Sequence, residues 1–217
     1  MHRALAQAGC RASENRIARV MQKHGIKARV ATIRYTNPTL QRFFAGARNE
    51  QLDLALNAPD QVWVGDITYL KVGGIYRYLA VVMDKHSRRV LGWAYGKNKN
   101  VALTLKALNR AARYRHPAPG LIFHTDRGIE YAALAFKARL SELGITQSMN
   151  RPGKVTDNAY IESFFHSMKS EFVHGNVFDA DRDIEYALRA YIPFYNGTRL
   201  HSSLNYVPPA TYEQLAG

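Results

Sequence analysis

Alternation between strand-like and helix-like segments after residue 60 is the feature that most limits how this chain can fold. Three segments rich in β-branched and aromatic residues follow one another with turn residues between them, and helical and strand patterns then alternate. The expected strands are 61–70, 75–83, 89–95, 120–124 and 145–149, and the expected helices are 101–114, 131–143 and 181–195. This order predicts an α/β fold in which helices flank a mixed sheet on both faces.

A further amphipathic helix is expected over residues 157–172, where Asp157 can cap the start. Its buried stripe would consist of Ile161, Phe164, Phe165, Met168 and Phe172. The neighbouring face carries Asn158, Glu162, His166 and Lys169. On an isolated helix such a face indicates a solvated surface with ion pairs at helical spacing, so Glu162 has a chemical role only if other carboxylates join it.

The first quarter of the chain is strongly basic. The 217 residues hold 30 Lys and Arg against 17 Asp and Glu, a net charge of +13 that predicts a polyanionic partner such as nucleic acid. Short helices are expected at 2–8 and from Ser13 to a stop at Gly25. Two such basic helices fit a partial helix-turn-helix over 1–27 and a plain basic helix pair equally well. Residues 28–58 are predicted to be a basic linker with a short helix near 40–44, and 59–217 to form the main domain with a C-terminal helical extension.

Composition also excludes several classes of protein. No apolar run approaches the length of a bilayer span, and the N-terminus lacks the apolar segment of a secretion signal, so we expect no membrane association and a cytoplasmic location. Cys10 is the only cysteine, which excludes internal disulfides and a zinc site built on paired cysteines.

Three carboxylates lie where the expected fold could use them for chemistry. Asp66 is in the middle of the first strand, and Asp126 follows strand 120–124 at the sheet edge where α/β proteins bind ligands. Each of the three carboxylates, Glu162 of the helix 157–172 included, also has an ordinary explanation. Asp66 could make a backbone contact at a bulge, Asp126 could belong to a turn before Gly128, and Glu162 could form a solvated ion pair. Together, oxygen ligands without cysteine suit Mg²⁺ or Mn²⁺, and two such ions can drive in-line attack at phosphorus.

The order and spacing of several motifs resemble the DDE transposase and retroviral integrase superfamily, most closely the OrfB transposases of the IS-three family of bacterial insertion sequences. The likeness runs from about Pro59 to Glu213. Its motifs are 63–69 around Asp66, 124–128 around Asp126, 157–165 around Glu162 with Lys169 seven positions beyond that glutamate, and the segments 83–89 and 195–204.

The resemblance implies a ribonuclease-H-like core whose catalytic residues Asp66, Asp126 and Glu162 hold two Mg²⁺ (or Mn²⁺) ions. It implies a transposase that cleaves the ends of an insertion sequence and joins the exposed 3′-hydroxyls to double-stranded DNA, acting as at least a dimer in the bacterial cytoplasm, at the nucleoid when DNA-bound. The expected DNA-binding residues are Asn158, Lys169 and Arg199 in the core and Arg16, Arg19 and Lys23 in the basic head.

Two other functions stay open from the residues alone: a plain nuclease with the same core, and a non-catalytic or decayed DNA-binding protein. Residues 1–27 match the family's helix-turn-helix only in part, so we expect either a shortened reading frame or a fused segment contributed by an upstream frame. Asp84 is expected to stabilise a turn, and His124 to serve in hydrogen bonding or packing.

Overall fold

The computed structural model describes residues 2–26 and 37–216, and the chain divides into two units, Met1–Asn37 and Pro38–Gly217. The first unit contains α1 (His2–Gln7) and α2 (Glu14–Lys23). The Ser13 hydroxyl accepts a hydrogen bond from the backbone N–H of Arg16 at 3.3 Å, so the predicted cap is confirmed. Residues 28–36 of the predicted linker lie outside the described residues.

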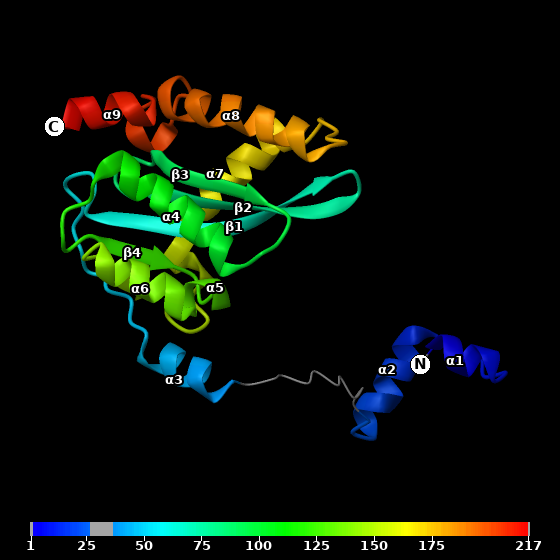
Figure 1. The fold of residues 1–217 in the computed structure, drawn as a ribbon. Coiled ribbons are helices and arrows are strands. Elements are labelled where there is room, and N and C mark those ends of the chain that lie inside the picture. The colour runs from blue at the N-terminus through cyan, green and yellow to red at the C-terminus, as the bar shows by residue number, and fades with distance from the viewer. Residues whose placement is uncertain (1, 27–36, 217) are drawn as a thin grey trace. The chain divides into compact units, whose positions relative to one another are not determined.

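A five-stranded mixed sheet forms the centre of the second unit, with strand order β3-β2-β1-β4-β5 (Figure 1). The strands are β1 (Val62–Val72), β2 (Ile75–Asp84), β3 (Val90–Gly96), β4 (Ile122–Thr125) and β5 (Thr146–Met149). The first three form an antiparallel meander, and β4 and β5 add parallel strands beside β1. The predicted mixed sheet is confirmed, and each strand lies within a residue or two of its expected place.

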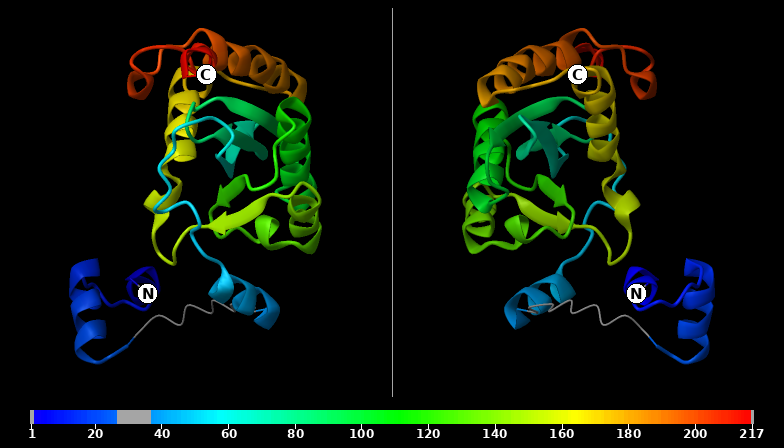
Figure 2. Two further views of the ribbon diagram at one scale, coloured as in Figure 1. Left: turned by 90° about the vertical axis from the view of Figure 1, so that its left-hand side faces the viewer. Right: turned by 90° about the vertical axis from the view of Figure 1, so that its right-hand side faces the viewer.

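Helices cover both faces of the sheet (Figure 2). On one face lie α4 (Val101–Arg115), α5 (Ile129–Ala132) and α6 (Leu134–Glu142), and on the other lie α7 (Ala159–Met168) and α8 (Asp181–Gly197), with α9 (Pro209–Ala216) next to α8. Side chains of a strand alternate between faces, so Trp63 enters the core beneath α4 while Val62 and Val64 enter the core beneath α7. The two cores hold the sheet rigidly between its helices.

Two helix predictions differ from the structure. The helix expected at 131–143 is two helices, because the backbone at Ala133 is extended (φ −63°, ψ 140°) and separates α5 from α6. The helix expected at 157–172 begins at Ala159, and after Met168 it continues as a π-helical turn, Lys169–Val173. Its stripe of Ile161, Phe164, Phe165 and Met168 is buried as predicted, whereas Phe172 is only partly buried.

Asp157 does not cap α7, so that prediction is wrong. Its carboxylate accepts hydrogen bonds from the backbone and guanidinium of Arg151 and from the side-chain amide of Asn49. Pairing with Arg151 holds the pKa of this carboxyl well below its usual range. A charged partner offers the carboxylate stronger hydrogen bonds than the helix end does, and Asp157 therefore ties three loops together.

Residues 38–58 belong to the second unit, so their prediction as a linker is wrong. They include α3 (Pro38–Gly46), and the guanidinium of Arg127 donates to the carbonyl oxygen of Phe44 at 2.6 Å. The buried Gln51 donates to the carbonyl of Asp157 at 3.1 Å. These contacts use backbone acceptors, which leave no periodic pattern in the sequence.

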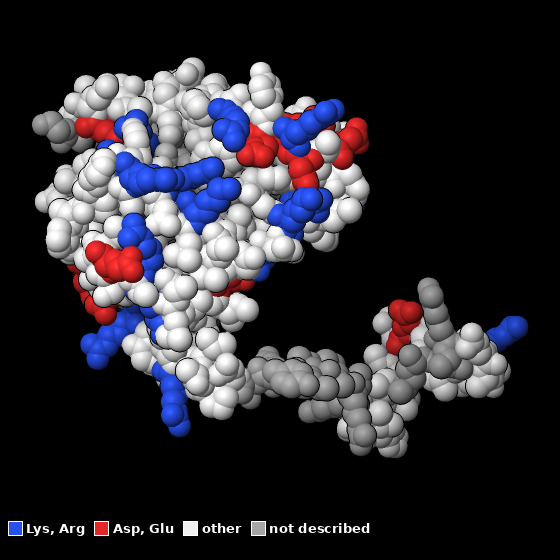
Figure 3. All heavy atoms as spheres, viewed as in Figure 1, with Lys and Arg blue, Asp and Glu red and all other residues white. Residues whose placement is uncertain are grey.

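Basic side chains spread over the face that carries α4, with acidic ones in smaller groups (Figure 3). The helix itself contributes Lys106, Arg110, Arg113 and Arg115. Such a surface attracts polyanions. Among the helices described, none has the length and apolar character needed to cross a bilayer.

Candidate active site

Asp66 lies on β1 just past the point where β4 stops pairing with it, since β4 pairs with Val62–Gly65. Its carboxylate is partly buried and accepts the backbone N–H of Ile67 at 2.7 Å. Burial raises the pKa of Asp66 to about 7, and the negative charges of Asp126 and Glu162 add to the rise. The charges of the other two predicted carboxylates therefore both reach Asp66.

Asp126 directly follows β4, beside Asp66. Gly65 and Thr125 are paired across the two parallel strands, and each aspartate is the next residue along its own strand. Neighbouring strands lie about 4.8 Å apart, which brings the two side chains to one sheet end. The carboxylate of Asp126 accepts the backbone N–H of Gly128 at 2.9 Å, and burial raises its pKa.

Glu162 is the outer member of the three. It lies on the exposed side of α7, in the helix that crosses β1, and its charge contributes less to the pKa of Asp66 than Asp126 does. Within 2–26 and 37–216, no three His, Cys, Asp or Glu side chains stand arranged to hold a metal ion. The fold therefore fixes the two aspartates together and places Glu162 near them without closing a three-ligand site.

Lys169 lies beside the carboxylates. Its ammonium nitrogen is 4.5 Å from the ring centroid of Tyr69 on β1. Burial lowers the pKa of Lys169, and the charge of Asp66 opposes that change. This placement agrees with a phosphate contact near the reacting bond, which stays a prediction.

The structure corrects the role expected for Asn158. The side chain is 1% exposed, and its amide donates to the carbonyl of Gly65 at 3.4 Å. A side chain in this position has no surface to offer to DNA; it joins the start of α7 to β1 next to Asp66.

The other predicted DNA contacts stay predictions. Arg199 is paired with a carboxylate, whereas the three basic residues of α2 are exposed. The guanidinium of Arg199 donates to both carboxylate oxygens of Glu171 at 2.8 Å, so a phosphate would have to compete with that pair. Arg16, Arg19 and Lys23 are exposed on α2 in the first unit.

Two residues beside the aspartates were not expected from the sequence. Glu130 is 6% exposed, and one of its carboxylate oxygens has no hydrogen-bond partner in the described part of the chain. The ammonium of Lys99 lies 3.7 Å from that oxygen, and its charge lowers the pKa of both Asp66 and Asp126. Glu130 lies in the first turn of α5 while Asp126 lies before that helix, and Lys99 lies in a loop, so no periodic signal in the sequence relates either residue to the aspartates.

Two ordinary roles predicted from the sequence are confirmed. Asp84 is fully buried and accepts backbone N–H bonds from Asp60 and Ser87, both at 2.7 Å, which stabilises the turn between β2 and β3. His124 lies buried within 2.8 Å of the side-chain oxygens of Ser148 and Asn150, and burial lowers its pKa to about 4. Neither residue belongs to the acidic site.

An aspartate within β1, a second one directly after the parallel strand β4, a glutamate on the helix across them and this strand order define a DDE-type polynucleotidyl transferase with a ribonuclease-H-like core. Models of the integrase core domain match residues 57–155 and 143–209. The transposase of insertion sequence element IS904 from Lactococcus lactis subsp. lactis (strain IL1403) is 31% identical over 215 residues, which cover 98% of this chain and 85% of that protein. Transposase InsF of insertion sequence IS3A from Escherichia coli (strain K12) is 34% identical over 201 residues, which cover 91% of this chain and 69% of that protein. The chain belongs to this family of insertion-sequence transposases with an integrase core, and it is a DNA transposase of the integrase type.

Solved structures agree on the fold. The chain is similar to a chain of the simian T-cell lymphotropic virus intasome in complex with a PP2A regulatory subunit, with TM-score 0.60 and 18% identity over 74% of this chain and 56% of that one. It is also similar to the HTLV-2 integrase catalytic core domain in complex with magnesium, with TM-score 0.52 and 17% identity over 72% of this chain and 97% of that one. At such identities the likeness shows the ribonuclease-H-like fold alone.

Proposed function

We propose that this transposase cuts the ends of an insertion sequence and joins the exposed 3′-hydroxyls to DNA, with Asp66, Asp126 and Glu162 as its catalytic residues. The observation that carries the proposal is the placement of Asp66 and Asp126 side by side on the parallel strands β1 and β4, with Glu162 on α7 near enough for its charge to raise the pKa of Asp66. Converging carboxylates with reduced access to water destabilise a fold, and such groups gather where chemistry needs them.

The donor set suits a divalent cation. Carboxylate oxygens are the ligands that Mg²⁺ and Mn²⁺ prefer, and a cation would relieve the repulsion between Asp66 and Asp126. Those two residues would hold it, and Glu162 would turn toward them to complete the site. The similar HTLV-2 core was solved with magnesium, which supports the choice of metal. Two Mg²⁺ ions, when bound, would supply positive charge to activate the attacking oxygen and stabilise the leaving one.

The reaction we propose replaces one oxygen on phosphorus by another: cutting turns a phosphodiester into a 5′-phosphate and a 3′-hydroxyl, and joining exchanges one phosphodiester for another. In both steps the attacking oxygen gives up a proton. A water oxygen during cutting, or a DNA 3′-hydroxyl oxygen during joining, forms a new bond to phosphorus while the bond to the leaving 3′-oxygen breaks. The leaving oxygen takes up a proton, and no bond between enzyme and DNA forms. Lys169 would bind a phosphate oxygen near the reacting bond, because its three donors tolerate varied geometry. Lys99, held by Glu130, would limit the repulsion within the acidic pair.

Transposition brings two DNA ends together, so we propose at least a dimer on DNA. A similar chain is part of a viral intasome, which supports an assembled state. The first unit, with Arg16, Arg19 and Lys23 exposed on α2, would bind the element ends. The complex would act in the bacterial cytoplasm, at the nucleoid.

The experiment is a strand-transfer assay with a matched element end, target DNA and Mg²⁺ or Mn²⁺. Glu162→Gln should abolish the joined product and leave DNA affinity, measured by fluorescence anisotropy, close to that of the unchanged chain. Glu185→Gln, at a partly exposed carboxylate on α8 paired with Arg189, is the control and should join normally. Joining by the Glu162 variant would contradict its assignment. Cutting without joining by the unchanged chain would indicate a nuclease, and DNA binding without either step a non-catalytic protein.

A further inference from the structure

Three tyrosines and a lysine share one face of the β1–β2 hairpin. The register pairs Tyr69 with Tyr78 and Lys71 with Tyr76, and residues paired directly across two strands point to the same side of a sheet. Tyr69 and Tyr76 are 59% and 58% exposed, and their rings meet edge to face with centroids 5.3 Å apart. We call these four residues the hairpin face.

The hairpin face is a continuous aromatic surface rather than a scatter of exposed rings. Single exposed apolar residues are common on proteins and need no explanation. Here the rings of Tyr69 and Tyr76 contact each other. Tyr78 lies half-buried across from Tyr69, and the exposed Lys71 lies across from Tyr76. Packing within the fold does not account for rings that leave more than half of their surface in water.

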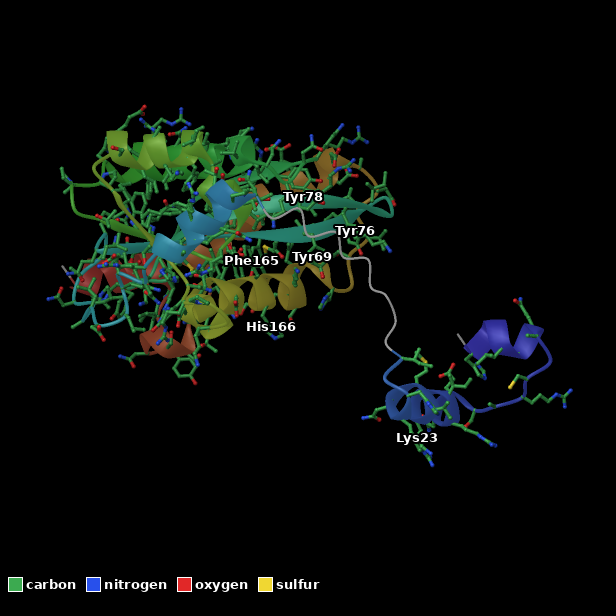
Figure 4. All side chains as sticks on the ribbon, turned by 90° about the horizontal axis from the view of Figure 1, so that it is seen from below. Lys23, Tyr69, Tyr76, Tyr78, Phe165 and His166 are labelled. Atoms are coloured by element: carbon green, nitrogen blue, oxygen red, sulfur yellow. The ribbon has the colours of Figure 1, made fainter. Side chains whose placement is uncertain are left out.

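Lys169 connects the hairpin face to the acidic site. Its ammonium lies 4.5 Å from the Tyr69 centroid and feels the charge of Asp66. Because β4 stops pairing with β1 at Gly65, β1 runs on past the end of β4, and Lys169 contacts Tyr69 there. Figure 4 shows Tyr69 between the hairpin and α7 with Tyr76 nearer the hairpin tip.

We propose that the hairpin face is a stacking platform for unpaired DNA bases next to the acidic site, an inference that rests on the proposed function. Every base has a flat π-face that stacks on an aromatic ring whatever the sequence, while Lys71 and Lys169 supply positive charge for the backbone. In a duplex the faces of the bases are occupied by their neighbours. The platform therefore distinguishes unpaired ends from paired DNA.

The spacing along β1 fits this ligand. Tyr69 lies three residues beyond Asp66, which at a rise of roughly 3.3 Å per residue is about 10 Å. Stacked nucleotides advance about 3.4 Å each along a strand, so this distance spans about three of them. Because the spacing of three residues is odd, Asp66 and Tyr69 leave β1 on opposite faces of the sheet. From a phosphodiester held at the aspartates, the unpaired nucleotides of a frayed or cleaved end would pass around the edge of β1 beyond Gly65, where Lys169 contacts Tyr69, to reach Tyr69 and Tyr76.

The test measures binding alone, with the whole chain and without divalent cations. Two DNAs of equal length carry 2-aminopurine at one end: a blunt duplex, and a duplex whose last three or so nucleotides are unpaired. Binding should change the 2-aminopurine fluorescence only at the unpaired end. Tyr69→Ala should weaken binding to the unpaired end by about 5- to 150-fold, the range for losing one base–aromatic stack, and leave the blunt-duplex affinity unchanged.

Two controls separate stacking from folding. Tyr69→Phe keeps the ring and should bind the unpaired end as the unchanged chain does. Tyr186→Ala removes a tyrosine that is 78% exposed on α8, and it should change neither affinity. If Tyr69→Ala lowers the thermal unfolding midpoint, Tyr76→Ala replaces it and carries the same expectation.

Equal affinity for the two DNAs in the unchanged chain would overturn the inference, as would equal losses for both DNAs in the alanine variants. A shift from dimer to monomer in Tyr76→Ala, measured by sedimentation without DNA, would assign the face to contact between protein copies and would also overturn it. Because binding is read without catalysis, failure of the strand-transfer assay leaves this result intact, and the two proposals fail separately.

Discussion

At the scale of single residues, Asp66 makes the site sensitive to pH. Its pKa is raised from 3.8 to about 7, so the folded protein holds this proton more tightly than the unfolded chain does. The resulting stability is present at low pH and is lost as the pH rises toward the folded-state pKa and above it. The loss is about 1.4 kcal/mol for each pH unit that separates the pKa of the unfolded chain from that of the folded protein. Without divalent cations, the free energy of unfolding attributable to Asp66 should therefore fall between about pH 4 and about pH 7.

Asp66→Asn tests this expectation. The variant cannot ionise at this position, so urea unfolding should show a smaller loss of stability across that range than in the unchanged chain. Asp53→Asn, at an exposed carboxylate, is the control and should follow the unchanged chain. Identical pH slopes for all three proteins would show that Asp66 titrates normally.

Divalent cations should reverse the pH effect. A cation binds the ionised carboxylates, so Mg²⁺ or Mn²⁺ should raise the thermal unfolding midpoint more at about pH 8 than at about pH 5. Asp66→Asn and Asp126→Asn each remove a ligand and should abolish the rise, whereas Asp53→Asn should keep it. A rise that survives both aspartate changes would place the metal elsewhere.

Lys99 should lower the pKa of the aspartate pair in the folded protein. Its charge opposes the rise at both Asp66 and Asp126, so Lys99→Met should move the carboxyl titrations of both residues to higher pH, observed by carbon NMR. Lys97→Met is a matched control, because that ammonium lies in the same loop but 3.9 Å from Asp181 instead. Titrations unchanged by Lys99→Met would remove Lys99 from the site.

At the scale of elements, Asn158 joins α7 to β1. Asn158→Ala removes the donor to the Gly65 carbonyl in a buried position, which should reduce the free energy of unfolding by about 1–3 kcal/mol. Because the side chain is buried, affinity for blunt duplex DNA should stay unchanged, measured by anisotropy. Asn176→Ala removes a similar amide bond, to Phe172 at 2.8 Å, from an exposed position and should have a smaller effect on stability. A loss of DNA affinity without a loss of stability would restore the DNA-contact role expected from the sequence.

The elements that the sequence predicts well are those with a local signal. Alternating strands, the Gly73–Gly74 turn and the apolar stripe of α7 depend on neighbours in the chain, and both aspartates were placed by their positions in those strands. What escaped prediction depends on distant partners. Asp157 leaves the helix cap for Arg151, six residues earlier, and for Asn49, which is far away in the sequence; the loop conformation that brings these partners together has no periodic signal.

At the scale of the whole molecule, the boundary between the two units at residues 37 and 38 differs from the predicted domain start at residue 59. The segment between them docks through hydrogen bonds from Arg127 to Phe44, from Gln51 to the Asp157 carbonyl, and from Asn49 to the Asp157 carboxylate. Phe43, Phe44 and Leu56 of this segment also pack against the two cores. Hydrogen bonds to backbone acceptors and a few scattered apolar residues leave no regular hydrophobic periodicity, which explains why the sequence pattern did not reveal the docking.

Two shortened chains test that boundary. A chain that starts at Pro38 keeps every one of these contacts, so its thermal unfolding midpoint should match that of the second unit in the whole protein. A chain that starts at Pro59 loses the bonds that Phe44, Asn49 and Gln51 make to Arg127 and Asp157 and exposes the apolar surface that Phe43, Phe44 and Leu56 cover, so it should unfold at a lower temperature. These hydrogen bonds are partly buried, so each one lost should contribute about 0.5–1.5 kcal/mol to that difference. Equal midpoints would mean that residues 38–58 add nothing to the fold of the transposase core and that the start predicted from the sequence is the true one.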